Sequence, residues 1–163
     1  MRNVFGFGLA LAAGFLAAVF WVWAGDAERQ VRRHQARLFG ALEEKKWAVV
    51  DRSFSEEYGD RWGHDKEFLK GFSREIFRQF LDLEIRSGET GLEVSGDGQE
   101  ARLRLRVELR GRGGPYAEGA VAAVRALGEP MVFHWSRRGR SAWDWVLVGF
   151  EQPELELPEL PVL

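Results

Sequence analysis

The sequence contains no cysteine and only 3 histidines among its 163 residues. The absence of cysteine excludes disulfides, thiolate nucleophiles, cysteine-ligated zinc and lipid attachment through a thiol. The histidines, His34, His64 and His134, do not have the spacing of metal ligands. The chain also lacks a nucleophile elbow, a phosphate-binding loop and the dinucleotide-binding glycine pattern. We therefore expect neither a metal site nor a bound cofactor.

The chain also has no large excess of positive or negative charge. The 23 lysines and arginines nearly balance the 25 aspartates and glutamates, so the formal net charge is -2. Because nucleic-acid binding depends on a basic surface, this balance predicts no nucleic-acid partner. Hydrophobic residues make up 45% of the chain, which excludes a fully disordered protein, and the length suits one domain.

Long hydrophobic runs are missing except at the N-terminus. Residues 4–24, VFGFGLALAAGFLAAVFWVWA, contain no charged side chain, and about 20 apolar residues let a helix cross a bilayer. Trp21 and Trp23 stand where an interfacial aromatic belt would fall. We expect residues 1–25 to form a transmembrane anchor that meets the membrane through residues 4–24. A cleaved signal segment, which would leave a secreted protein, is the alternative.

Two signals disagree about which side of the membrane the rest of the chain occupies. Several arginines follow the apolar run, and a positive-inside count would keep the domain in the cytoplasm. A very short head before a single apolar segment is instead typical of an uncleaved export signal. We expect a single-pass protein whose domain lies on the periplasmic side, and the cytoplasmic placement stays open.

The chain after the apolar run begins with helical periodicity. Residues 26–46 and 47–58 place apolar side chains at helical spacing, which predicts two helices. Asp65 then stands where it can cap a third, phenylalanine-rich helix.

The spacing changes to alternation after the third helix, and alternation is typical of half-buried strands. Strands are predicted over residues 81–85, 92–94, 102–110, 131–136 and 142–150. Asp97 and Gly98 suit a hairpin turn. Residues 111–119 are glycine-rich and predict a loop, whereas residues 120–127 fit either a strand or a helical turn.

Helices followed by strands predict an α+β domain over residues 26–152, a cone of about three helices packed on a curved antiparallel sheet. The concave side of such a sheet, closed by the first helix, offers a pocket for a small apolar ligand. Residues 153–163 are rich in proline and glutamate and predict an extended tail. Such a tail can add to a sheet edge or lie in a groove of another protein.

The order of helices and strands, with the closing segment FHWSRRGRSAWDWVLVGF, resembles the nuclear transport factor 2-like superfamily. The stretch WDWVLVGFEQPELELPE resembles a group of membrane-anchored bacterial proteins in it. The resemblance implies a cone fold. It does not select a function, because the superfamily holds ketosteroid isomerases, polyketide cyclases, dehydratases and domains that only bind or dimerise.

An enzyme of this kind would need an acid or base inside the cone, where burial tunes its pKa. The candidate residues are Tyr58, Asp60, His64, His134 and Asp144. A catalytic pair of His134 and Asp144 depends on which strand face points inward. The alternatives are an outer-face histidine, an aspartate beside a turn, and a capping or solvated role for His64.

A row of arginines alternates along the strand at residues 102–110. Arg102, Arg104, Arg106 and Arg110 are predicted to face outward. They suit a polar homodimer face or a solvated face paired with glutamates rather than nucleic acid. We expect a non-catalytic binding or assembly module of the cell envelope. A small-molecule isomerase, cyclase or dehydratase that uses the cone pocket is the alternative.

Overall fold

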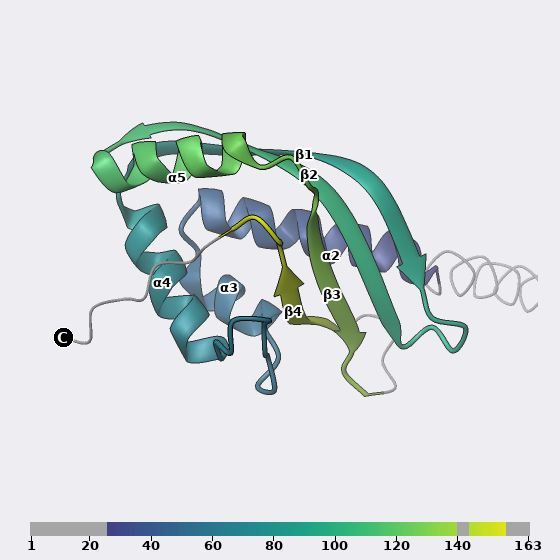
Figure 1. Cartoon of the computed structure of the whole chain (residues 1–163). Helices are drawn as coiled ribbons and strands as arrows, with labels where there is room; N and C mark the ends of the chain where they lie inside the picture. Colours follow the sequence, from purple (N-terminus) through teal and green to yellow (C-terminus); the bar gives the residue numbers. More distant parts are fainter. Residues whose placement is uncertain (1–25, 140–143, 156–163) are drawn as a thin grey trace, which may run out of the picture.

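The computed structural model describes residues 26–139 and 144–155, and four helices lie against a four-stranded antiparallel sheet there (Figure 1). The elements are α2 (Ala27–Glu43), α3 (Trp47–Ser53), α4 (Lys66–Arg78), β1 (Phe80–Val94), β2 (Glu100–Gly113), α5 (Pro115–Ala126), β3 (Met131–Arg137) and β4 (Trp145–Glu151). The proposed anchor at residues 4–24 and most of the predicted tail lie outside the described residues. Within the described part of the chain, no helix is both long and apolar enough to cross a membrane.

Side-chain caps start the two longest helices. The Asp26 carboxylate accepts the Arg29 N–H, and Asp65 accepts the Phe68 N–H at 2.8 Å, which confirms the predicted cap of α4. Each cap satisfies an amide that the first helical turn leaves free. The second helix is shorter than predicted, because the chain from Phe54 leaves it to run beside β4. There the Ser55 N–H donates to Leu147 O at 2.9 Å.

The sheet has the order β1-β2-β3-β4 and curves around α2 (Figure 1). The sequence predicted two strands over residues 81–94, but the structure has the single strand β1. The reason is that its middle is exposed on both faces and therefore shows no apolar alternation. The predicted turn is confirmed, with Gly98 at φ +69 between β1 and β2.

The glycine-rich segment is not the predicted loop. Gly111 and Gly113 belong to β2, and Pro115 opens α5, where the missing N–H of proline costs no hydrogen bond. A Cβ at Gly113 would lie 2.3 Å from Gln79 O, so this position requires glycine for the close approach of the chain before β1. The ambiguous residues 120–127 lie almost wholly within this helix.

The concave face of the sheet is packed against α2. Leu103 of β2 and Trp135 of β3 are 1% exposed. The Trp135 indole N–H donates to Gln35 Oε1 of α2 at 3.1 Å, and the Phe133 ring meets the Phe39 ring edge-on at 5.8 Å. The long helix therefore fills the part of the cone under β2, β3 and β4.

Candidate functional site

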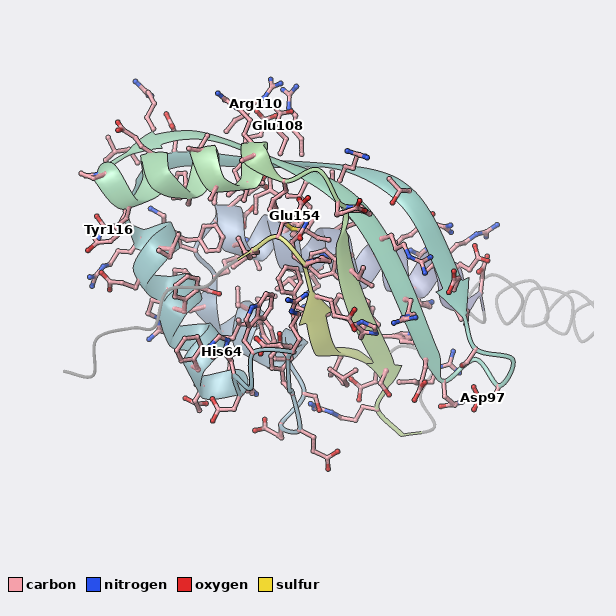
Figure 2. The ribbon with its side chains drawn as sticks, in the orientation of Figure 1. His64, Asp97, Glu108, Arg110, Tyr116 and Glu154 are labelled. Carbon is pink, nitrogen blue, oxygen red and sulfur yellow. The ribbon has the colours of Figure 1, made fainter. Side chains whose placement is uncertain are left out.

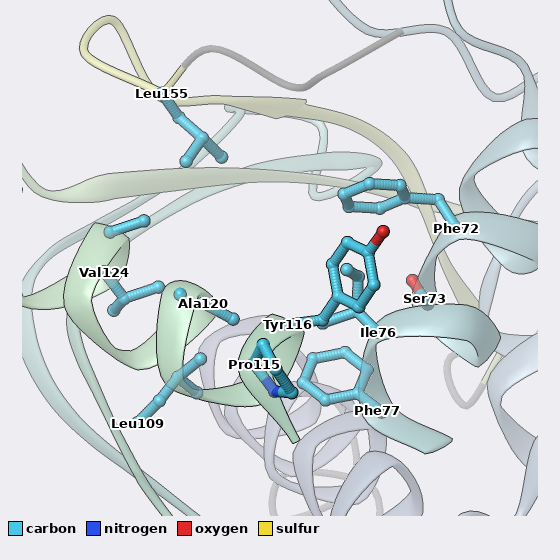
Figure 3. Close-up of a pocket in the computed structure, with 12 residues that line it drawn as sticks. Phe72, Ser73, Ile76, Phe77, Leu109, Pro115, Tyr116, Ala120, Val124 and Leu155 are labelled. Carbon is cyan, nitrogen blue, oxygen red and sulfur yellow. The ribbon is translucent and has the colours of Figure 1, made fainter. Parts of the chain in front are cut away.

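A cavity of about 400 Å³ opens at the other end of the concave face, between α4 and α5 (Figure 3). Its walls come from α4, α5, the last inward position of β2 and the chain after β4. The lining includes Phe72, Ile76, Phe77, Leu109, Tyr116 and Leu155. Pockets for small molecules commonly have volumes of about 300–1,000 Å³, so this one has room for a modest ligand.

Side-chain size explains why a cavity forms here. The helix α5 presents Gly119, Ala120 and Ala123, which reach only a short way toward α4. Phe72 and Phe77 stand opposite them on α4 (Figure 3). The phenylalanine spacing of α4 faces inward as an amphipathic helix should. Of the α5 residues that line the cavity, only Tyr116 has a side chain of matching size, and it is 68% exposed. The space between the two helices therefore stays open.

The cavity wall is almost free of polar atoms. Among the described lining residues, Ser73 and Tyr116 supply the side-chain hydroxyls, and there is no aspartate, glutamate, histidine, lysine or arginine. Tyr116 is 68% exposed and stands at the mouth. General acid–base catalysis needs an ionisable group within hydrogen-bond reach of the ligand. This wall suits the binding of a neutral apolar molecule better than proton transfer.

The predicted pair of His134 and Asp144 is not brought together. His134 faces away from the inward Phe133 and Trp135, on the outer side of the sheet. Asp144 precedes β4 beside Arg138, four strand positions beyond His134, or about 13 Å at the usual rise of a strand. His134 Nε2 lies 2.8 Å from Glu151 Oε1 without the alignment of a hydrogen bond.

Three other candidates gather in the loop before α4. The Asp60 side chain is fully buried and accepts the N–H groups of Trp62 and His64, both at 2.9 Å. The His64 Nδ1 lies 3.1 Å from Asp60 Oδ2, and the His64 ring stacks on Phe68 at 3.8 Å. Burial, together with the Asp60 charge, raises the pKa of the Tyr58 hydroxyl, which has no hydrogen-bond partner. These bonds fold the loop.

The loop cluster does not serve the cavity. Figure 2 shows His64 beside the first turn of α4 and Tyr116 near the opposite end of that helix, next to α5. The cavity takes its α4 wall from Phe72 onward, whereas His64 contacts Phe68, one turn earlier. None of the five predicted acid or base residues lines the cavity.

The arginine row lies where the alternation predicted, outward on β2. Arg104 reaches Glu93 at 2.7 Å and holds the pKa of that carboxyl below its usual range. Arg110 pairs with Glu108 at 2.8 Å and lowers the pKa of that carboxyl as well. Arg102 lies 3.9 Å from Glu151. Three of the four arginines in the row thus have an acidic neighbour, so the outer face is not a purely basic strip.

The sequence did not identify the cavity residues. The sequence predicted α4 as a phenylalanine-rich helix, but it assigned the start of the helix opposite, α5, to a loop. The available signal was Pro115 followed by an alanine-rich run, which favours a helix start. The glycines before that proline concealed it.

Solved structures resemble the domain in shape. Bd1075 from Bdellovibrio bacteriovorus aligns with a TM-score of 0.57 at 5% identity over 76% of this chain and 39% of its own. A conserved protein from Planctomyces limnophilus gives 0.55 at 16% identity, covering 76% and 91%. A nuclear transport factor 2-like protein of unknown function from Pseudomonas putida gives 0.52 at 10% identity, covering 76% and 83%.

These likenesses establish the fold, which is nuclear transport factor 2-like. The chain spans about two fifths of the length of Bd1075. No protein-family model matches the sequence, and comparison with curated proteins finds no match. The function must therefore be argued from the cavity.

Proposed function

We propose that this protein is a non-catalytic binding module of the cell envelope that holds a small, neutral, apolar molecule between α4 and α5. The observation that carries the proposal is the cavity of about 400 Å³, whose described wall carries two hydroxyls and no charged group. Burial of apolar area contributes about 25 cal/mol per Å², so a ligand that fills such a space gains affinity without a charged partner.

The position of the cavity bears on how a ligand would arrive. The first turns of α2 lie near the middle of β1, where Arg32 bonds Glu89 at 2.8 Å, and its far end lies near Phe80, whose carbonyl accepts from Lys45. The cavity is at the Phe80 end, beside Phe77. If residues 4–24 cross the membrane, the 17 residues of α2 would set the cavity about 25 Å away from it. We propose that the ligand enters from water.

Binding of a neutral fluorescent apolar probe, N-phenyl-1-naphthylamine, tests the proposal on the full chain. Ala120→Trp would place a large ring in the cavity, and Ala122→Trp is the matched control, because Ala122 lies on the same helix outside the lining. Both proteins carry the same apolar segment and detergent, so the difference between them reports the cavity. We expect Ala120→Trp to weaken probe binding about tenfold or more and Ala122→Trp to leave it unchanged. Equal binding by the two variants would refute the proposal.

Catalysis in the same cavity would depend on Tyr116, because the described lining offers no other titratable side chain. An isomerase, cyclase or dehydratase of this kind would lose its turnover in Tyr116→Phe but keep probe binding. A pure binding module keeps its whole function in that variant.

Exposure of intact spheroplasts to an added protease tests the periplasmic placement, and complete protection of the domain would overturn it.

A further inference from the structure

We infer that the cavity has an occupant within the same chain, the C-terminal segment of residues 156–163, which competes with the ligand. The inference rests on the proposed function. The structure describes the chain up to Leu155, and the Leu155 side chain is itself part of the cavity wall (Figure 3). The segment that follows therefore begins at the rim.

Two side chains fix the chain where it reaches this rim. Gln152 is completely buried, and its amide donates to Glu129 O and accepts the Glu154 N–H, both at 2.7 Å. The Glu154 carboxylate accepts the Gly128 N–H at 2.6 Å and the Glu129 N–H at 3.2 Å. Glu154 thus holds the turn that follows α5 (Figure 2). Leu155 then lies on the same side of the cavity as Val124, with the rings of Phe72 and Phe77 on the other side (Figure 3).

The sequence of the segment matches such a site. Residues 156–163 read ELPELPVL, in which Leu157, Leu160 and Leu163 recur every third position. A polyproline II helix has three residues per turn, so these leucines would share one face and the prolines another. Proline-rich segments of this conformation dock in grooves lined by aromatic side chains. Phe72, Phe77 and Tyr116 line this one.

Length and charge agree with an occupant from the same chain. Eight residues of polyproline II span about 25 Å, whereas the ten residues from Pro115 to Val124 along α5 span about 14 Å. The segment can therefore cross the cavity from Leu155 with residues to spare. Its glutamates, Glu156 and Glu159, fall on a third face of the polyproline helix, which can stay in water while the leucines are buried.

Engineered disulfides test the inference directly, because the chain has no cysteine of its own. Ala120→Cys with Leu160→Cys places one thiol in the cavity wall and one in the segment. Ala122→Cys with Leu160→Cys is the control on the same helix. After mild oxidation of the dilute full chain, free thiols are counted by the band shift that maleimide-polyethylene glycol produces. We expect the cavity pair to close within one chain about tenfold faster than the control, because docking raises the effective concentration of the thiols.

Equal rates for the two pairs would overturn the inference, as would crosslinks only between chains, since those would place the segment on a second copy. A second pair, Ala120→Cys with Leu157→Cys, uses another residue of the leucine face and guards against an unsuitable geometry at Leu160. Its control is Ala122→Cys with Leu157→Cys, and failure of both pairs to outpace their controls counts against docking. Leu157→Asp with Leu160→Asp should raise the affinity for N-phenyl-1-naphthylamine about fivefold. If Ala120→Trp does not change probe binding, the proposed ligand is wrong. The disulfide rates still test separately whether the segment docks in the cavity.

Discussion

The two ends of the concave face have the same apolar character and opposite outcomes. Under β3 and β4, Trp135 and Phe133 reach α2 and belong to the buried core cluster. Under α5, the sheet offers Leu109 and the helix offers alanine and glycine, so a cavity remains. Hydrophobicity alone therefore does not distinguish a core from a binding site. The sizes of facing side chains decide which one forms.

The filled end also carries polar bonds that fix its geometry. The buried Gln35 of α2 accepts the Trp135 indole N–H, whereas the cavity wall shows no corresponding bond between α4 and α5 among the described residues. A buried hydrogen bond that is satisfied favours one arrangement of helix and sheet. Among the described residues, the open end lacks this constraint.

The largest effect is expected at the filled end. Trp135→Ala would remove a side chain that is 1% exposed and leave the Gln35 amide without its donor. We expect the free energy of unfolding to fall by about 3–5 kcal/mol. Urea unfolding followed by circular dichroism measures the change. The matched variant Phe72→Ala at the cavity should cost about half as much or less, because its ring is already partly exposed. Similar losses in the two variants would break the comparison between the two ends.

Adding volume should have opposite signs at the two ends. Ala101→Leu places extra carbons where Ala101 is 4% exposed and opposite Trp135, and we expect it to lower the free energy of unfolding by about 1–3 kcal/mol. Ala120→Leu fills part of the cavity, and we expect it to raise the free energy of unfolding by about 0.5–1 kcal/mol. Unfolding midpoints in urea measure both. A loss in Ala120→Leu would mean that the cavity cannot accept bulk.

The strand pattern of the sheet could be predicted from the sequence, whereas the cavity could not. Alternation in β2 identified Leu103 as inward and Arg104 as outward, because period two is unmistakable in a half-buried strand. The start of α5 was wrongly assigned to a loop, because glycines that serve close strand contact look the same as glycines of a loop. From the sequence alone, residues 120–127 fit either a strand or a helical turn. The cavity was beyond prediction for the same reason, since one of its walls is that helix. Its emptiness depends on which residues face each other across the space, and no local pattern records that.

A buried hydroxyl gives the next smaller effect. Tyr58 is 4% exposed, its hydroxyl has no partner, and burial raises its pKa. Tyr58→Phe removes the unpaired group, so we expect about 1 kcal/mol of added stability at neutral pH. A raised pKa in the folded state favours folding only while the group stays neutral. The wild type should therefore lose stability as pH rises above about 10, where the unfolded tyrosine ionises. Chemical unfolding at pH 7 and pH 11 checks both points, and an equal alkaline loss in Tyr58→Phe would assign it to other groups.

The smallest effect is expected on the outer face, where charges are already paired in water. Arg104→Glu with Arg106→Glu breaks the bond from Arg104 to Glu93, yet we expect almost no change in the unfolding midpoint, because exposed ion pairs contribute little. The pair lowers the Glu93 pKa, so its small contribution is present above the usual glutamate range and fades as pH falls through it. The arginine row was predicted to suit either a homodimer face or a solvated face. If this face forms a homodimer, the double variant should sediment as a monomer while the wild type does not. If the double variant is still a dimer, the dimer interface lies on another face of the domain. An unfolding midpoint that drops sharply would show that the outer face, and not only the two ends of the inner one, determines stability.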